Sequence, residues 1–315
     1  MGLTIGVDVG GTKIAAGVVD ESGRVLSRAR RDTPSHDPGA TEDAIAGLVD
    51  ELRSGFEVEA IGLGAAGFVD AERARVVFAP NLAWRNEPLR EAIERRTGLP
   101  AVVENDANAA AWAEARFGAG AGEPQLVVIT VGTGIGGAII SDGRLVRGRF
   151  GIAAEIGHMG MVPEGRRCGC GNQGCWEQYA SGRALVREAR QLASAAPESA
   201  AQLLGLADGR AGAIDGPMVT AAARLDDEAA LESFRVVGTW LGYGIADLAV
   251  ILDPGTFIIA GGVSYAGDLL LEPAAQAYLS RLSGRGHRPT ADIVLGRLGG
   301  DEAGIIGAAD LARHR

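Results

Sequence analysis

One histidine and all three cysteines of the 315-residue chain lie within eighteen consecutive positions. His158 is followed by Cys168, Cys170 and Cys175. One imidazole and three thiolates form a donor set that tetrahedral Zn²⁺ accepts, and four protein ligands leave no open position for a catalytic water. The spacing is not the C-x-x-C of dithiol exchange. The cluster therefore predicts a structural zinc site, with three reduced thiols in a glycine-rich loop as the alternative.

Two glutamates flank the predicted zinc ligands. Glu155 lies three residues before His158, and Glu177 lies two residues after Cys175. A metal that holds both segments in register would present the two carboxylates on one rigid wall, where they could accept hydrogen bonds from sugar hydroxyls. Taken separately, each would be an ordinary surface acid. Their positions beside metal ligands favour the sugar-binding interpretation.

Three glycine-rich turns could surround a nucleotide. They are Gly10-Gly11-Thr12-Lys13, Gly132-Thr133-Gly134 and Gly261-Gly262. Glycine lets backbone N–H groups approach phosphate oxygens, and the two threonines add hydroxyl donors. Each turn alone is more often plain hairpin chemistry, and the pattern is neither a P-loop nor a dinucleotide-binding fingerprint. Three such turns in one chain favour phosphate binding.

Two aspartates next to these turns and helices could act in phosphoryl transfer. Asp8 ends the first predicted strand, where it would either meet the Mg²⁺ of a nucleotide or cap a tight turn. Asp106 follows Asn105 at the start of a helix, where it would be an N-cap, a general base for an attacking hydroxyl, or both. Lys13 is the one lysine among thirty lysines and arginines, which points to a need for a compact ammonium in its turn.

The elements that must position these residues form a duplicated α/β pattern. Strands are predicted at 3–9, 14–19 and 24–30, and a shift of 122 residues places Val9-Gly10 on Val131-Gly132, where strand, glycine turn and hairpin recur. The segment 118–124 is the best linker candidate. Further strands are expected at 58–63, 101–104, 257–260 and 292–295, and helices at 39–54, 87–97, 107–117, 181–195, 216–230, 231–252 and 302–313.

Composition narrows the class of protein. A net charge of −10 and a pI near 5.0 argue against nucleic acid as a main partner. No apolar run approaches the roughly 20 residues of a membrane span, so no membrane partner is expected. A strand that starts at Leu3 leaves no room for a signal peptide, and thiols kept as metal ligands fit the cytoplasm.

These motifs together resemble the ROK family of repressors, open reading frames and sugar kinases, and within it the bacterial ATP-dependent glucokinases of actinobacterial type. The resemblance runs in order from residue 5 to about residue 265, so it covers essentially the whole chain. It rests on Asp8–Lys13, Glu104–Asn108, Thr130–Gly137, Glu155–Met159, Cys168–Glu177 and Ile259–Gly262. The His-Cys-Cys-Cys spacing with its flanking glutamates is the specific part.

The resemblance implies an actin-like, hexokinase-like α/β ATPase fold with two lobes and an active-site cleft between them. The expected small lobe is 1–117 with the last helix, 302–315, and the large lobe is 118–301. Asp106 would be the catalytic base. The sugar would be bound by Gly67, Asn105, Asp106, Glu155, His158 and Glu177. ATP and its Mg²⁺ would be bound by Asp8, Gly10, Gly11, Thr12, Lys13, Thr133, Gly134, Gly261 and Gly262. Structural Zn²⁺ would be bound by His158, Cys168, Cys170 and Cys175.

The expected activity is transfer of the ATP γ-phosphoryl group to the 6-hydroxyl of glucose by a cytoplasmic homodimer or homotetramer. Rival sugars are N-acetylmannosamine, N-acetylglucosamine, fructose and allose, and polyphosphate is a rival donor. A sugar-sensing regulatory module is the non-enzymatic alternative. Asp106 weighs against a sensor, as does the lack of a DNA-binding segment ahead of Leu3.

Overall fold

The computed structural model describes residues 2–314 of the chain. They divide into two compact units. The first unit contains Met1–Pro124, Ala138–Ala154 and Arg297–Arg315, and the second contains Gln125–Gly137 and Glu155–Gly296. The lobe boundaries expected from the sequence stay a prediction.

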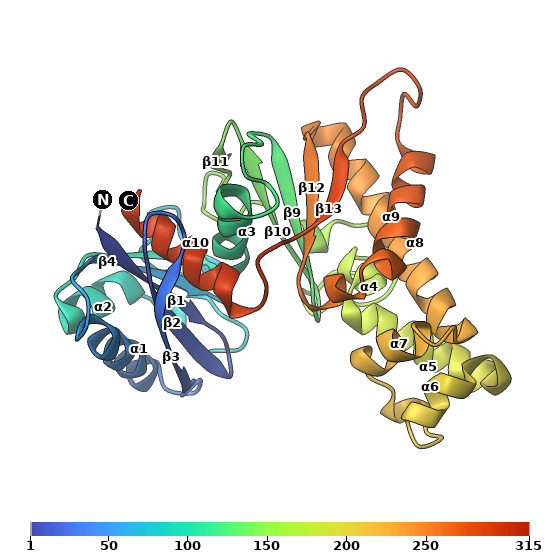
Figure 1. Cartoon of the computed structure of the whole chain (residues 1–315), viewed down its shortest axis with the longest axis horizontal. Helices are drawn as coiled ribbons and strands as arrows, with labels where there is room; N and C mark the ends of the chain where they lie inside the picture. Colours follow the sequence, from blue (N-terminus) through green and yellow to red (C-terminus); the bar gives the residue numbers. More distant parts are fainter. Residues whose placement is uncertain (1, 315) are drawn as a thin grey trace. The chain divides into compact units, whose positions relative to one another are not determined.

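Two five-stranded sheets repeat one topology (Figure 1). The first has the order β3-β2-β1-β4-β8, and the second has the order β11-β10-β9-β12-β13. In the first sheet, β1 pairs in parallel with β4, and β4 pairs in parallel with β8. In the second sheet, β9 pairs in parallel with β12, and β12 pairs in parallel with β13. The identical order confirms the duplicated α/β fold that the offset of the two glycine turns predicts. The strands are β1 (Leu3–Val9), β2 (Lys13–Val19), β3 (Val25–Asp32), β4 (Val58–Ala65), β8 (Ala101–Asn105), β9 (Leu126–Val131), β10 (Ile135–Ser141), β11 (Arg144–Leu145), β12 (Thr256–Ala260) and β13 (Asp292–Leu295).

A row of glycines on the first sheet lets helix α10 (Asp301–Arg313) pack against the strand backbone. Gly17, Gly6 and Gly62 lie side by side on β2, β1 and β4. A Cβ at Gly62 would lie 1.7 Å from the Ala308 carbonyl oxygen, and one at Gly6 would lie 1.8 Å from that of Ile305. The last helix is therefore part of the core of the first unit, between the sheet and helix α3 (Asp106–Phe117).

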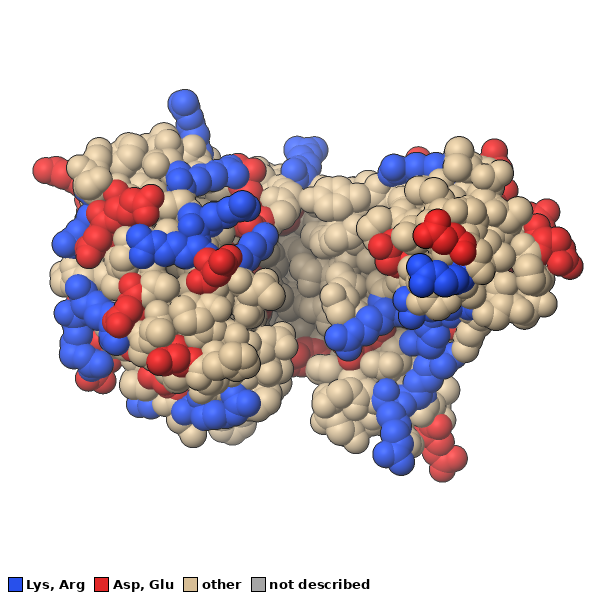
Figure 2. All heavy atoms as spheres, turned by 90° about the horizontal axis from the view of Figure 1, so that it is seen from below, with Lys and Arg blue, Asp and Glu red and all other residues tan. Residues whose placement is uncertain are grey.

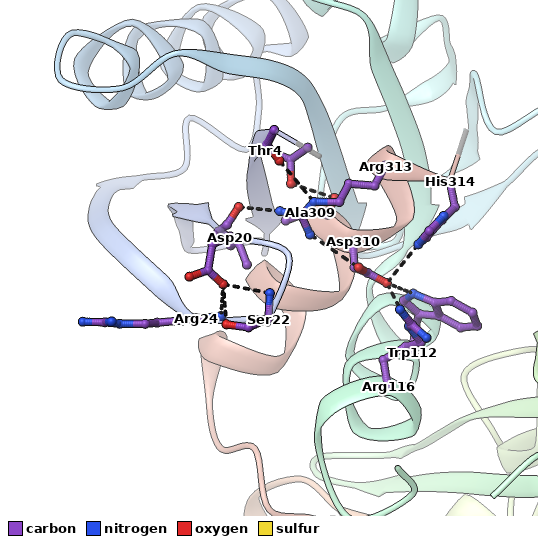
Figure 3. A network of polar contacts seen from close by, with 12 residues as sticks. Thr4, Asp20, Ser22, Arg24, Trp112, Arg116, Ala309, Asp310, Arg313 and His314 are labelled. Atoms are coloured by element: carbon purple, nitrogen blue, oxygen red, sulfur yellow. Dashed lines mark hydrogen bonds and ion pairs between the residues drawn. The ribbon is translucent and has the colours of Figure 1, made fainter. Parts of the chain in front are cut away.

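A buried carboxylate locks α10 onto α3. Asp310 is 1% exposed, and its Oδ2 accepts hydrogen bonds from Trp112 Nε1 at 2.8 Å and Arg116 Nε at 3.3 Å (Figure 3). Arg313 pairs with the other oxygen at 3.4 Å and donates to the carbonyls of Gly2 and Val19. Asp310 thus ties the C-terminal helix to the second half of α3, at Trp112 and Arg116.

The opposite face of the first sheet is covered by α1 (Pro38–Arg53) and α2 (Leu89–Thr97). Asp37 caps α1, and its side chain accepts a hydrogen bond from the amide of Ala40. Apolar residues of α1, among them Ile45, Leu48 and Val49, are fully buried against the strands. A small sheet of β5 (Phe68–Val69), β6 (Val76–Phe78) and β7 (Arg85–Glu87) lies between β4 and α2 in the chain and was not expected from the sequence.

The second unit is built around the long helix α8 (Glu228–Leu252), which packs on α9 (Asp268–Arg281). Gly242 brings α8 so close that a Cβ there would lie 2.1 Å from the Ala274 carbonyl oxygen of α9. Among the described residues, one helix, α8, is long enough and apolar enough to span a membrane. Half of its most apolar 18-residue stretch is buried inside the protein, as in a core helix.

The remaining helices of the second unit follow the expected pattern with one correction. The helix expected over 216–230 ends at Ala223, because Asp227 caps a new helix and its side chain accepts from the Ala230 amide. The helices are α4 (Glu177–Ala180), α5 (Gly182–Ala195), α6 (Ala201–Leu206) and α7 (Gly216–Ala223), with short 3₁₀ turns at Ile156–His158, Pro197–Ala200, Ala211–Ala213 and Gly262–Ala266.

Charged side chains of both signs are mixed on the surface. On the face drawn in Figure 2, acidic and basic groups are interspersed on the left, and a short run of basic groups lies at the right.

Candidate active site

The turn between β8 and α3 holds the expected catalytic base. Asn105, not Asp106, is the N-cap of α3, because Asn105 Oδ1 accepts a hydrogen bond from the Asn108 amide at 3.0 Å. Asn105 Nδ2 donates to the Gly67 carbonyl oxygen at 3.0 Å and to Asp106 Oδ1 at 3.1 Å. Asp106 is the first residue of the helix. The sequence allowed Asp106 to be a helix cap, a general base or both, and in the structure Asn105 is the cap.

Burial makes Asp106 a stronger base. Removal from water raises the pKa of the Asp106 carboxyl, while hydrogen bonds from the Ala107 amide, its own amide and the Asn105 side chain act in the opposite direction. A carboxylate whose pKa is raised toward neutrality takes a proton from an alcohol more readily. Gly67 is buried, so its carbonyl is a fixed partner for Asn105.

The first glycine turn brings acidic and basic groups together in the first unit. Lys13 Nζ lies 2.8 Å from Asp301 Oδ2 at the start of α10, and both side chains are more than a third exposed. Burial raises the pKa of Asp8 to about 7, the charges of Asp106 and Asp301 add to the rise, and Lys13 opposes it. Two further carboxyl groups thus act on Asp8 beside the turn. Such a set is suited to a cation, which would offset their repulsion.

The turn itself is tight. The Gly10 amide donates to the Lys13 carbonyl oxygen at 3.0 Å, and Thr33 Oγ1 donates to the Gly10 carbonyl oxygen at 2.8 Å. A Cβ at Gly11 would lie 2.8 Å from Asn81 Cβ, so a larger residue would displace the neighbouring loop. Thr12 is exposed and available to a ligand.

In the second unit, the four predicted zinc ligands converge. The ligand atoms of His158, Cys168, Cys170 and Cys175 all lie within 4.8 Å of one another. His158 Nδ1 lies 3.6 Å from Cys168 Sγ, and Cys170 Sγ lies 3.6 Å from Cys175 Sγ. Tetrahedral zinc with bonds of about 2.3 Å to sulfur and 2.05 Å to nitrogen would require separations of about 3.6 Å (S to N) and 3.75 Å (S to S). The donor set and its spacing fit Zn²⁺.

The three cysteines form no disulfide, and a metal that binds Cys168 would have to displace the proton of its thiol. Burial raises the pKa of Cys168 to about 12, and the Glu177 carboxylate, with Oε1 3.0 Å from the sulfur, adds to the rise. A bound cation reverses this preference, because zinc ligates the thiolate.

The acids that flank the cluster lie against it. Glu155 Oε2 is 3.9 Å from His158 Nε2, the ring nitrogen that does not face the sulfurs. Glu177 lies between the cluster and the second glycine turn, since a Cβ at Gly134 would lie 2.4 Å from Glu177 Oε2. Trp176 holds this segment in place: it is fully buried and donates from Nε1 to the Trp240 carbonyl oxygen at 2.7 Å.

A cavity of about 1390 Å³ opens beside the second and third glycine turns. Thr133 and Gly262 line one end, and the N-terminus of α5 meets the second turn there through the Gly182 amide, which donates to the Gly132 carbonyl oxygen at 2.8 Å. Gly261, next to Gly262, has φ +90°, a conformation that favours glycine. The rest of the lining comes from α5, α7 and the turn after β12. It includes Val186, Ser194, Pro217, Thr220, Ala221, Val263 and Tyr265, together with the arginines Arg183, Arg187, Arg190 and Arg224. The volume and the largely apolar walls suit a nucleoside.

This fold, with its His-Cys₃ cluster and glycine turns, defines an ATPase-like sugar kinase architecture, and the chain belongs to the ROK family, which it matches over residues 4–315. It is 56% identical to a glucokinase of Streptomyces coelicolor over 314 residues, which cover 100% of this chain and 98% of that protein. Among solved structures, it is similar to a ROK family glucokinase from Streptomyces griseus in complex with glucose and AMPPNP, with 56% identity, full coverage of both chains and a TM-score of 0.88. A ROK hexokinase from Thermus thermophilus is 34% identical, with 99% and 98% coverage and a TM-score of 0.81.

Sequence reasoning missed two sets of residues. The cavity walls on α5 and α7 carry no motif, and only folding brings them to the glycine turns. The second set surrounds Glu104, which stands directly before Asn105 and forms buried ion pairs that no short pattern in the chain signals.

Proposed function

We propose that this protein is an ATP-dependent glucokinase that makes glucose 6-phosphate and ADP. The observation that carries the proposal is the full-length similarity, at 56% identity, to glucokinases that include one solved with glucose and AMPPNP. Three features of the structure support it: a buried carboxylate beside an amide at the start of α3, glycine turns beside a cavity, and acids next to a His-Cys₃ cluster whose spacing fits zinc.

In the proposed reaction, Asp106 accepts the proton of the glucose 6-hydroxyl as its oxygen bonds to the γ-phosphorus. The bond from that phosphorus to the bridging oxygen of ADP breaks at the same time, and ADP leaves. Asn105 orients the Asp106 carboxylate through its amide and, with Gly67, Glu155, His158 and Glu177, binds sugar hydroxyls. The raised pKa of Asp106 supports its role as base.

Three turns are proposed to bind the nucleotide. Gly10, Gly11, Thr12 and Lys13 in one unit and Thr133 and Gly134 in the other would donate to phosphate oxygens, and Gly261 and Gly262 would adjoin the adenosine. Mg²⁺ supplies charge neutralisation for the phosphates, and Asp8 is the carboxylate placed to approach it.

Zinc is proposed as a structural ion held by His158, Cys168, Cys170 and Cys175. Binding through His158 Nδ1 leaves Nε2 for a sugar hydroxyl or for Glu155, 3.9 Å away. The protein is further proposed to be soluble and cytoplasmic, and to work as a homodimer or homotetramer, as the resemblance to the family implies.

A coupled assay of ADP release tests the activity. With Mg-ATP and a panel of glucose, mannose, fructose, allose, N-acetylglucosamine and N-acetylmannosamine, the highest kcat/KM is expected for glucose. Polyphosphate in place of ATP is expected to give little glucose 6-phosphate. A higher kcat/KM for another hexose, or no turnover with any, would contradict the assignment.

The Asp106→Asn variant tests the base. It keeps the size of the side chain but removes the proton acceptor, so turnover should fall by about 10²-fold or more while glucose binding, followed by calorimetry, stays nearly intact. Asp310→Asn is the matched control, because Asp310 is also buried against α3 but touches no proposed ligand. Wild-type turnover in Asp106→Asn would refute the base.

A further inference from the structure

Glu104 is a buried charge beside the proposed catalytic turn. It is 2% exposed and stands one residue before Asn105 on β8. Its Oε2 accepts a hydrogen bond from Arg147 Nε at 2.6 Å and lies 3.5 Å from Arg73 Nε. Its Oε1 accepts from Asn108 Nδ2 at 3.0 Å and from the Asn105 amide at 3.2 Å. All four contacts lie within the first unit.

The two oxygens of Glu104 serve different parts of the chain. Oε1 accepts a hydrogen bond from the side-chain Nδ2 of Asn108. The backbone amide of Asn108 donates to the Asn105 side chain, so Oε1 supports the N-cap that sets the direction of α3. Oε2 holds Arg147, whose carbonyl oxygen accepts from the Ala153 amide at 3.0 Å and closes the loop between them. Glu104 therefore joins the turn that carries Asp106 to the segment that leads directly into Glu155.

Arg73 adds a third segment and an excess of positive charge. Its Nη2 donates to the Leu311 carbonyl oxygen of α10 at 3.4 Å, and its Nε is buried without a hydrogen bond. Burial lowers the pKa of Arg73 to about 10, and the charge of Arg147 lowers it further, whereas Glu104 raises it. One carboxylate thus holds two guanidinium groups together, and its removal would leave them to repel each other.

The ion pairs of Glu104 would not need to lie beside Asp106 if their role were only to stabilise the fold. Burying a carboxylate with two arginines is costly and often adds little stability compared with apolar residues. What the arrangement does provide is a fixed geometry for the N-cap of α3. Small displacements of a catalytic group lower rates strongly, so such a fixture has a use in catalysis.

We propose that Glu104, held by Arg147, is a positioning residue for the phosphoryl transfer: it fixes the Asn105 cap and so the direction in which Asp106 presents its carboxylate. This inference rests on the proposed function and adds residues to it. Glu104 and Arg147 are not placed in contact with substrate.

The test is steady-state kinetics of the full-length protein with glucose and Mg-ATP. Glu104→Gln keeps the shape of the side chain but loses the charge, and Arg147→Met removes the partner from a site that is 25% exposed, where folding tolerates change. Each should lower kcat by about 10- to 100-fold, as loss of supporting partners does at other sites, while the KM for ATP changes by less than about twofold. Arg147→Lys should recover part of the loss. The kcat of the double variant should be no lower than that of the less active single variant, because both changes break the same contact.

Glu42→Gln is the matched control. Glu42 is 5% exposed and its Oε2 lies 2.9 Å from Arg96 Nη1, so the same substitution breaks another buried pair in the same unit, on α1. Its kcat should stay within about twofold of wild type, because Glu42 lies on α1 and makes no contact with the turn that carries Asp106. If Glu104→Gln does not fold, the two Arg147 variants decide the question alone.

The outcomes separate the two proposals. A wild-type protein without hexokinase activity refutes the proposed function and this inference with it. Normal wild-type turnover, with kcat of Arg147→Met and Glu104→Gln within about twofold of it, overturns the positioning role only. An equal loss of kcat in Glu42→Gln, or strictly multiplicative losses in the double variant, would likewise overturn it.

Discussion

Replacing Asp8 by asparagine should make the free protein more stable while it removes activity. The Asp8 side chain is largely withdrawn from water and lies close to α10, where a Cβ at Gly304 would be 2.9 Å from Asp8 Cγ. Burial, together with the charges of Asp106 and Asp301, raises its pKa from 3.8 to about 7. Asparagine has nearly the same shape and carries no charge, so it removes the electrostatic cost without disturbing the packing.

The size and sign of the effect follow from proton linkage. The unfolded chain releases the Asp8 proton near pH 3.8, whereas the folded chain keeps it until about pH 7. The folded state therefore loses stability as the pH rises between these values, and the whole loss persists above pH 7. A difference of about three pKa units corresponds to about 4 kcal/mol at pH 8, and only about 2 kcal/mol of it has developed at pH 5.

Thermal unfolding of both proteins at pH 5 and pH 8, without nucleotide, measures this difference. The Asp8→Asn variant should melt at a higher temperature at both values, with a gain at pH 8 that is about 2 kcal/mol larger than at pH 5. Mg-ATP should raise the melting temperature of the wild type more than that of the variant, because the cation offsets the charge of Asp8. The variant should show little glucose phosphorylation.

A gain that does not depend on pH would refute the assignment of a raised pKa to Asp8. A lower melting temperature of Asp8→Asn at pH 8 would show that the Asp8 charge stabilises the fold, contrary to the reasoning. Full activity in the variant would exclude Asp8 from the nucleotide site.

Other expectations concern the zinc loop and the core of the first unit. Removing zinc, verified by elemental analysis, should raise the KM for glucose or abolish activity, and unchanged kinetics in zinc-free protein would exclude a role of the metal in the sugar site. Gly62→Ala would force a Cβ to 1.7 Å from the Ala308 carbonyl oxygen, so it should lower stability by about 3 kcal/mol, whereas Gly55→Ala, with no atom within 4 Å, should not. Asp310→Asn should cost about 3 kcal/mol in chemical unfolding, because Arg313 is only 4% exposed and loses its partner, and kcat should hold. Full stability of Gly62→Ala or Asp310→Asn would contradict the packing described.

Local sequence patterns predicted much of the fold. Alternating apolar strands around glycine turns predicted the two hairpins, and the offset of 122 residues predicted the duplication that the two sheets confirm. Both features depend on residues close in sequence, where turn chemistry and side-chain periodicity act directly. The break at Asp227 and the small sheet of β5, β6 and β7 were not foreseen, because a cap inside a continuous apolar pattern and very short strands give weak local signals.

The sequence by itself determined which chemistry is possible: one histidine and three cysteines within eighteen positions can bind zinc, and Asn105-Asp106 can start a helix with a base. Only the tertiary structure decided which residue caps that helix, which nitrogen of His158 faces the sulfurs, and that Glu104 holds Arg147 and Arg73 beside the Asn105-Asp106 turn. These depend on distances between residues far apart in the chain, which packing sets and spacing in the sequence does not.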